Sequence, residues 1–183
     1  MRIIAGEMRG RQLKTVEGML TRPTSDKVKG AIFNILGDKV LDARVLDLFA
    51  GTGNLALEAI SRGSHDAVLV EKSRVAHRVI RKNIEQMGVS HKVELLLMDA
   101  FKYLRRFPDE VFDLVFLDPP YYEGLVLKVI LILKAHSYLA PDGVIVAETA
   151  KDEQLDGDLY PFEIRKIKDY GDTKVWYLQR MDV

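Results

Sequence analysis

Short apolar runs alternate with segments of helical periodicity through most of this chain, and this alternation strongly limits its possible folds. The apolar runs cover residues 44–49, 67–70, 93–98, 112–117 and 144–147. Between them, apolar residues recur every three or four positions, as they do on one face of a helix. Strands that alternate with helices form a mostly parallel sheet with helices on both faces. The sequence therefore predicts an α/β protein with a doubly wound, Rossmann-like sheet.

The C-terminal part departs from this rhythm. Residues 162–167 and 174–178 alternate apolar and polar positions with a period of two, and Tyr170-Gly171-Asp172 can form a turn between them. We therefore expect an antiparallel hairpin that completes the parallel sheet.

The N-terminal part is also distinct. Residues 2–5 and 11–14 predict a small β-hairpin, and Thr24 or Ser25 can cap a helix that ends near Leu36. A length of 183 residues favours one domain, residues 1–183. Within it we distinguish an extension, residues 1–40, and a core, residues 41–183.

The composition excludes several kinds of site. The chain has no cysteine, which excludes disulfides, iron–sulfur clusters, thiolate zinc sites and cysteine catalysis. No apolar stretch approaches the roughly 18 residues of a membrane span, and residues 1–7 lack the apolar region of a secretion signal. We therefore expect a cytoplasmic protein with no membrane partner and, by default, a monomer. We also expect no metal site, because the histidines share no metal-ligand spacing: His65, His77, His91 and His136.

Charge is unevenly distributed along a chain that is neutral as a whole. Residues 1–40 hold eight lysines and arginines against four acidic residues, a net charge of +4. A basic N-terminal arm can contact a polyanion. Charge alone does not separate this role from an ordinary solvated surface.

A glycine-rich loop follows the first core strand. Gly51 and Gly53 precede Ala56 in the spacing of a dinucleotide fingerprint, and Glu71 lies 20 residues after Gly51, where an acid can hold ribose hydroxyls. These two features fit a nicotinamide enzyme and another nucleoside-cofactor enzyme equally well. Asp47 places a carboxylate inside the loop, which suits a cationic ligand group, and Asp99 can accept a hydrogen bond from an adenine amino group.

A second loop, Asp118-Pro119-Pro120-Tyr121, follows the fourth strand at the same expected edge. Two prolines remove two N–H donors and stiffen the turn. The loop thus presents acceptors, the Asp118 carboxylate and the Pro119 carbonyl, beside the aromatic face of Tyr121. This arrangement suits a planar base with an exocyclic amine, stacked on the tyrosine.

Together these motifs resemble class I S-adenosylmethionine-dependent methyltransferases that methylate amines. The chain resembles more closely the RsmD family of 16S ribosomal RNA guanine-N2 methyltransferases, over nearly its whole length. Asn54 stands where many members have a small residue. The N-terminal motifs separate this family from other enzymes that have the Asp118–Tyr121 type of loop. The segments that match the family are 2–6, 9–11, 22–28, 33–36, 46–53, 58–63, 118–121 and 170–173.

The resemblance implies S-adenosylmethionine as cofactor, no metal, and small-subunit ribosomal RNA, free or in a ribonucleoprotein, as partner. The implied catalytic residues are Asp118, Pro119 and Tyr121. The implied cofactor-binding residues are Asp47, Gly51, Gly53, Glu71, Asp99 and Thr24. The implied RNA-binding residues are Arg2, Arg9, Arg11, Lys14 and Arg22.

Three alternatives remain open from the residues alone. A related enzyme could methylate adenine or cytosine in DNA or another RNA, or a small molecule, and only the N-terminal motifs argue against it. A nicotinamide oxidoreductase would leave the Asp118–Tyr121 loop and the C-terminal hairpin without a role. A non-catalytic RNA-binding module would not need the intact glycine and Asp118–Tyr121 loops.

Overall fold

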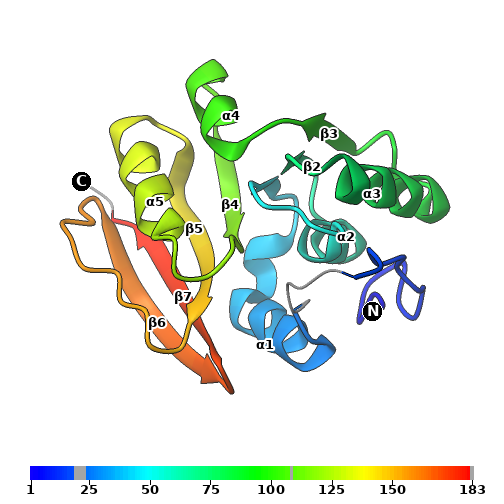
Figure 1. Ribbon diagram of the computed structural model, residues 1–183, viewed down its shortest axis with the longest axis horizontal. Coiled ribbons are helices and arrows are strands. Elements are labelled where there is room, and N and C mark those ends of the chain that lie inside the picture. The colour runs from blue at the N-terminus through cyan, green and yellow to red at the C-terminus, as the bar shows by residue number, and fades with distance from the viewer. Residues whose placement is uncertain (19–23, 108, 182–183) are drawn as a thin grey trace.

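A single seven-stranded sheet organises the protein, with strand order β3-β2-β1-β4-β5-β7-β6 (Figure 1). The computed structural model describes residues 1–18, 24–107 and 109–181. Strands β1 to β5 pair in parallel, which confirms the predicted doubly wound sheet. The strands are β1 (Arg44–Asp47), β2 (Asp66–Glu71), β3 (Val93–Leu97), β4 (Phe112–Leu117), β5 (Leu139–Ala150), β6 (Phe162–Tyr170) and β7 (Thr173–Arg180).

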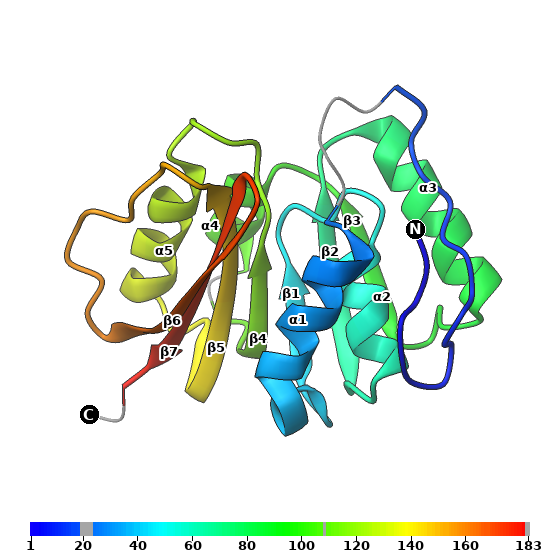
Figure 2. The same ribbon diagram turned by 90° about the horizontal axis from the view of Figure 1, so that it is seen from below.

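Helices cover both faces of the sheet (Figure 2). They are α1 (Asp26–Leu36), the short 3-10 helix η1 (Gly37–Val40), α2 (Asn54–Ser61), α3 (Arg74–Met87), α4 (Ala100–Arg106) and α5 (Leu125–Ala135). Alternate residues of each strand enter separate apolar clusters: Val45 packs in the cluster of α1, α2 and α3, whereas Leu46 packs in that of α4 and α5. Among the described residues, no helix is long and apolar enough to cross a membrane.

The C-terminal hairpin forms as predicted and extends the sheet. Strand β7 pairs antiparallel with both β5 and β6, so it lies between them. The turn at Gly171 joins β6 to β7, and its positive φ of 61° suits glycine.

Helix α5 is shorter and β5 is longer than the sequence pattern predicts. The apolar spacing predicts a helix to about Tyr138, a turn at 141–143 and a strand from Val144. In the structure α5 ends at Ala135 and β5 begins at Leu139. Tyr138 is fully buried and its hydroxyl donates to the carbonyl of Leu104, which requires the chain to leave the helix before it. The predicted turn at 141–143 lies within β5, where the pairing with β4 shifts register.

The predicted N-terminal hairpin forms as a short antiparallel pairing. Arg2 bridges Gln12, and backbone hydrogen bonds join Ile3 to Gly10 and Arg11. The segment also docks on the rest of the protein through its backbone. The N–H groups of Ile4 and Ala5 donate to the Glu58 carboxylate of α2 at 2.9 and 3.1 Å. Because the partners come from a helix distant in sequence, the local alternation could not indicate this path.

Gly6 permits a close approach between this segment and α2. Its φ is +83°, and a Cβ at this position would lie 1.8 Å from the carbonyl oxygen of Ser61. Further along, the side-chain amide of Asn83 on α3 pairs with the backbone of Lys14. The N-terminal segment is therefore fixed against α2 and α3.

Candidate active site

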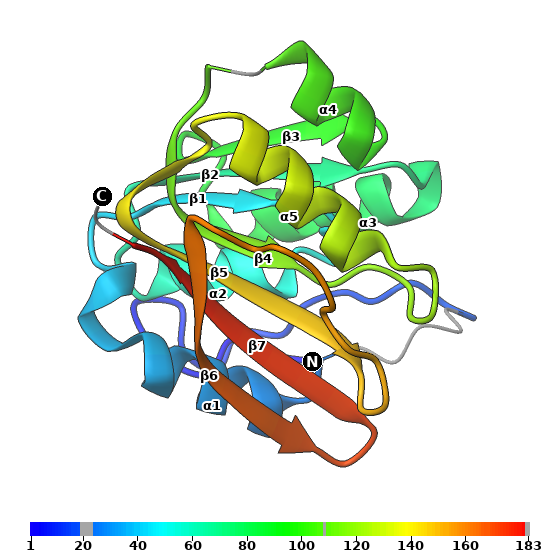
Figure 3. The ribbon, with the colours of Figure 1, turned by 90° about the vertical axis from the view of Figure 1, so that its left-hand side faces the viewer.

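Four carboxyl side chains come together at one edge of the sheet. Asp47 ends β1, Glu71 ends β2, Asp118 follows β4, and Glu148 lies near the end of β5. The arrows of β1, β2 and β3 in Figure 3 point to the same side, because these strands are parallel. Ligands of open α/β sheets bind at this edge.

The glycine loop connects β1 to α2 beside this edge. Gly51 has a φ of +60°, and its N–H donates to Glu71 Oε2 at 2.9 Å. The other oxygen of Glu71 accepts from Ser73 N at 2.7 Å. Gly53 is left-handed and is the N-cap of α2. Glu71 thus ties the glycine loop to the N-cap of α3.

Burial raises the pKa of three acids at this edge: Asp47, Asp118 and Glu148. With smaller contributions from Asp118 and Glu71, it raises the pKa of Asp47 to about 8. Burial also raises the pKa of Asp118 to about 6, although a hydrogen bond from Thr24 opposes the change. Burial and the neighbouring Asp118 raise the pKa of Glu148 well above its ordinary value. A bound cation would restore the ionised forms, so the edge is suited to a positively charged ligand.

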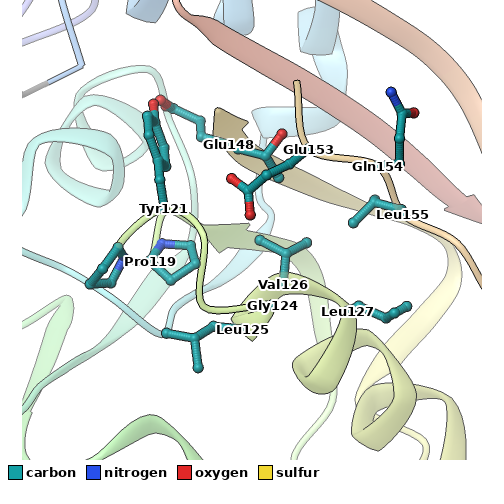
Figure 4. Close-up of a pocket in the computed structure, with 12 residues that line it drawn as sticks. Pro119, Tyr121, Gly124, Leu125, Val126, Leu127, Glu148, Glu153, Gln154 and Leu155 are labelled. Atoms are coloured by element: carbon teal, nitrogen blue, oxygen red, sulfur yellow. The ribbon is translucent and has the colours of Figure 1, made fainter. Parts of the chain in front are cut away.

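The Asp118–Tyr121 loop forms one wall of the edge. The hydroxyls of Tyr121 and Thr173 lie 2.8 Å apart, which fixes the tyrosine ring against the start of β7. Tyr121 and Glu148 help to line a small cavity of about 70 Å³. Figure 4 shows the side chains around it. Both residues also line a larger cavity, of about 320 Å³, between the start of α1 and the β6–β7 turn.

Thr24 reaches this edge from the residue before the α1 cap. Its hydroxyl lies 3.3 Å from Asp118 Oδ2 and 2.9 Å from Glu148 Oε1. The structure therefore places Thr24 beside the catalytic candidate Asp118. Glu148 was not predicted; the available signal was an acidic residue directly after the apolar run at 144–147.

A buried lysine supports Thr24 from below. Lys29 is fully buried, with Nζ 3.0 Å from Glu58 Oε2 and 2.6 Å from Asn54 Oδ1. The amide of Asn54 in turn donates to the Thr24 carbonyl at 3.3 Å. Asn54 therefore ties the start of α2 to Thr24. The sequence did not indicate this network, because its members are separated by up to 34 residues.

Asp99 lies at the end of β3 and caps α4. Its Oδ1 accepts from the N–H groups of Phe101 and Lys102 at 2.9 and 3.2 Å. The side chain is half-buried. Asp99 thus has a structural role as the N-cap of α4. Its contact with adenine stays a prediction.

The predicted RNA-binding residues differ in their surroundings. Arg9 and Lys14 have exposed side chains. Arg2 pairs with Asp26 at 3.1 Å, and Arg11 donates to the Met87 carbonyl at 3.3 Å. Arg22 lies outside the described residues.

No group of three or more histidine, cysteine or acidic residues in the described part of the chain has the geometry to hold a metal ion.

This chain has the fold and the site of class I S-adenosylmethionine-dependent methyltransferases. The features that define them are the strand order, the glycine loop, Glu71 and the Asp118–Tyr121 loop. Comparison with known proteins agrees. The family described as Conserved hypothetical protein 95 matches residues 1–179. The chain belongs to this family, which confirms the resemblance to the RsmD enzymes.

Individual relatives match over most of their length. A candidate ribosomal RNA methyltransferase of Bacillus subtilis, YlbH, is 35% identical over 177 residues, 96% of either chain. Ribosomal RNA small subunit methyltransferase D of Escherichia coli (strain K12) is 34% identical over 155 residues, 85% of this chain and 77% of that protein. A solved structure of a candidate Escherichia coli methyltransferase, yhhF, is 32% identical with a TM-score of 0.89, and covers 98% of this chain and 97% of its own.

Proposed function

We propose that this protein transfers a methyl group from S-adenosylmethionine to the exocyclic N2 of a guanine in 16S ribosomal RNA. The observation that carries the proposal is the Asp118-Pro119-Pro120-Tyr121 loop, which lies at the same sheet edge as Asp47 and Glu71. The names of the relatives support ribosomal RNA as the substrate class.

The residues at the edge fit the cofactor. No atom lies within 4 Å of where a Cβ of Gly51 would be, so there is open space beside the loop. Asp47, Gly51 and Gly53 would line the methionyl part, Glu71 would accept from the ribose hydroxyls, and Asp99 from the adenine amine. When bound, the cofactor supplies an electrophilic methyl group on a positively charged sulfur.

Asp118 and Pro119 would prepare the target amine for attack. The lone pair of an exocyclic amine is conjugated with the ring, which makes the nitrogen a poor nucleophile. Hydrogen bonds from its two protons to the Asp118 carboxylate and the Pro119 carbonyl favour a pyramidal nitrogen with a directed lone pair. The amine becomes acidic only as the new bond forms, so no base has to act first. Alignment, and stabilisation of the developing positive charge by Asp118, would supply most of the rate.

Tyr121 and the N-terminal segment would hold the RNA. The Tyr121 ring, fixed by Thr173, offers a face on which the target base stacks. Arg9 and Lys14 are exposed cations suited to phosphate contacts, which position RNA without reading its sequence. A guanine inside a helix could not enter the site, so the target would lie in a loop or be flipped out. The RNA, free or in an assembled particle, would be recognised partly by its shape.

The test is incubation of unmodified small-subunit ribosomal RNA, naked and as particles, with methyl-labelled S-adenosylmethionine. Mass spectrometry of the nucleosides should find the label in N2-methylguanosine. Label in another base would refute the guanine assignment, and no label with intact cofactor binding would refute ribosomal RNA as acceptor.

A matched variant tests the role of Asp118. Asp118→Ala should lower kcat far more than it weakens cofactor binding, because Asp118 contacts the amine. An equal loss of both would contradict this role.

A further inference from the structure

Glu148 occupies the strand position beside Asp118. Leu117 of β4 pairs in register with Ala147 of β5, so the next residues, Asp118 and Glu148, are neighbours across the two strands. The Glu148 side chain is 4% exposed. No role has yet been given to this buried acid.

The hydroxyl of Thr24 joins the two acids. It lies within hydrogen-bond distance of both Glu148 Oε1 and Asp118 Oδ2. A hydroxyl has one proton, so Thr24 can donate to only one of them. The other contact is favourable when that carboxyl carries a proton and donates it to Thr24.

Glu148 is the acid suited to carry this proton. Burial and the Asp118 charge raise its pKa well above the ordinary range, whereas the pKa of Asp118 rises only to about 6. A protonated Glu148 would donate through Oε1 to Thr24, and Thr24 would donate to ionised Asp118. Among the described residues, no donor contacts the second oxygen, Oε2, which stays an acceptor.

Glu148 lines a cavity large enough to receive part of a substrate. The cavity, of about 320 Å³, is lined by Thr24, Ser25, Tyr121, Glu148, Tyr170 and Thr173, among others. It thus extends from Tyr121, the ring proposed to stack the base, to Glu148.

We propose that Glu148 selects guanine, by accepting a hydrogen bond from N1–H of the target base while Asp118 and Pro119 hold its N2 amine. The inference rests on the function proposed above. Guanine presents two adjacent donors on its Watson–Crick edge, N1–H and the N2 amine. In adenine and cytosine the ring nitrogen next to the amine carries no proton. This nitrogen and the Glu148 oxygen would both be acceptors, and their lone pairs would repel. A buried acceptor left without a donor disfavours those bases.

The experiment compares two bases that carry the same amine. The target position is first mapped by mass spectrometry with the wild-type protein. RNA is then made with guanine or with 2-aminopurine at that position; 2-aminopurine keeps the 2-amine, but its N1 carries no proton. The wild-type protein should methylate guanine about 10- to 100-fold more efficiently, measured as kcat/KM.

Glu148→Gln should shrink or invert this ratio, because the amide can donate to N1 of 2-aminopurine. Asp169→Asn makes the same carboxyl-to-amide change at an exposed residue of the same cavity, and should leave the ratio unchanged. Retained cofactor binding by Glu148→Gln, measured by calorimetry, shows that this variant is folded.

The outcomes separate the two proposals. If Glu148→Gln lowers kcat/KM on both RNAs by the same factor, or leaves both unchanged, Glu148 does not select the base, and guanine methylation by the wild type still stands. If the wild-type protein forms no N2-methylguanosine, the proposed function fails first, and the selection of guanine fails with it.

Discussion

Cofactor binding should depend strongly on pH because Asp47 is protonated in the free protein. Its pKa is about 8, raised mainly by burial. A cationic ligand binds best beside the ionised carboxylate and lowers this pKa when it binds. The group therefore releases a proton on binding, and affinity rises as pH rises towards 8.

The size of the effect follows from the ionised fraction. With a pKa of about 8, roughly one Asp47 in a hundred is ionised at pH 6 and about half at pH 8. If only the ionised form binds tightly, Kd for S-adenosylmethionine should fall about 50-fold between pH 6 and pH 8 through this group alone. At pH 7, about 0.9 proton should be released for each ligand bound.

Isothermal titration calorimetry in buffers of different ionisation enthalpy measures both quantities. Asp47→Asn is the control, because it keeps the shape and removes the titrating group. The cofactor's own amine titrates equally with both proteins, so the difference between them isolates Asp47. A wild-type Kd that follows the same pH dependence as Asp47→Asn, with no extra proton released, would refute the reasoning.

Three further changes test the N-terminal docking and its role. Gly6→Ala should lower the free energy of unfolding, measured in urea, by about 1–3 kcal/mol more than Gly10→Ala does. Both glycines have a φ of +83°, but only at Gly6 would a Cβ meet α2. Equal losses in the two variants would contradict the close approach. Lys29→Met should lower the unfolding free energy by about 1–3 kcal/mol, because Asn54 loses a buried donor and Glu58 keeps only Arg62 of its two cations. Adding Glu58→Gln should recover part of the loss, and no recovery would argue against the ion pair as the cause. Arg9→Ala should weaken RNA binding and reduce the slope of log K against log salt by about one, and an unchanged slope would exclude a phosphate contact.

Much of the sheet and its glycine loop was predictable because the signals are local. Apolar runs and helical spacing predicted the five parallel strands. Ser73, a residue type typical of N-caps, lies directly before a helical pattern and caps α3, accepting from Ala76 N at 3.2 Å. Asp47 and Glu71 were predictable because Asp47 interrupts the apolar run at 44–49 and Glu71 directly follows the run at 67–70, and the carboxyl ends of parallel strands share an edge.

The features that sequence patterns missed depend on distant residues. The end of α5 is set by Tyr138, whose hydroxyl needs the Leu104 carbonyl. Lys29 has the spacing of an ordinary polar residue, and only the fold shows that it is fully buried against Glu58. Glu148 resembles a strand-terminal solvent residue until β4 brings Asp118 beside it.

The docking of the N-terminal segment through its backbone also affects how this protein can change over time. Main-chain N–H groups of Ile4 and Ala5 bind Glu58, and the main chain of Lys14 binds Asn83. The exposed side chains of Arg9 and Lys14 are not part of these docking contacts. Homologues can therefore exchange these side chains, and adapt the segment to a different RNA surface, while its path across α2 and α3 is inherited unaltered.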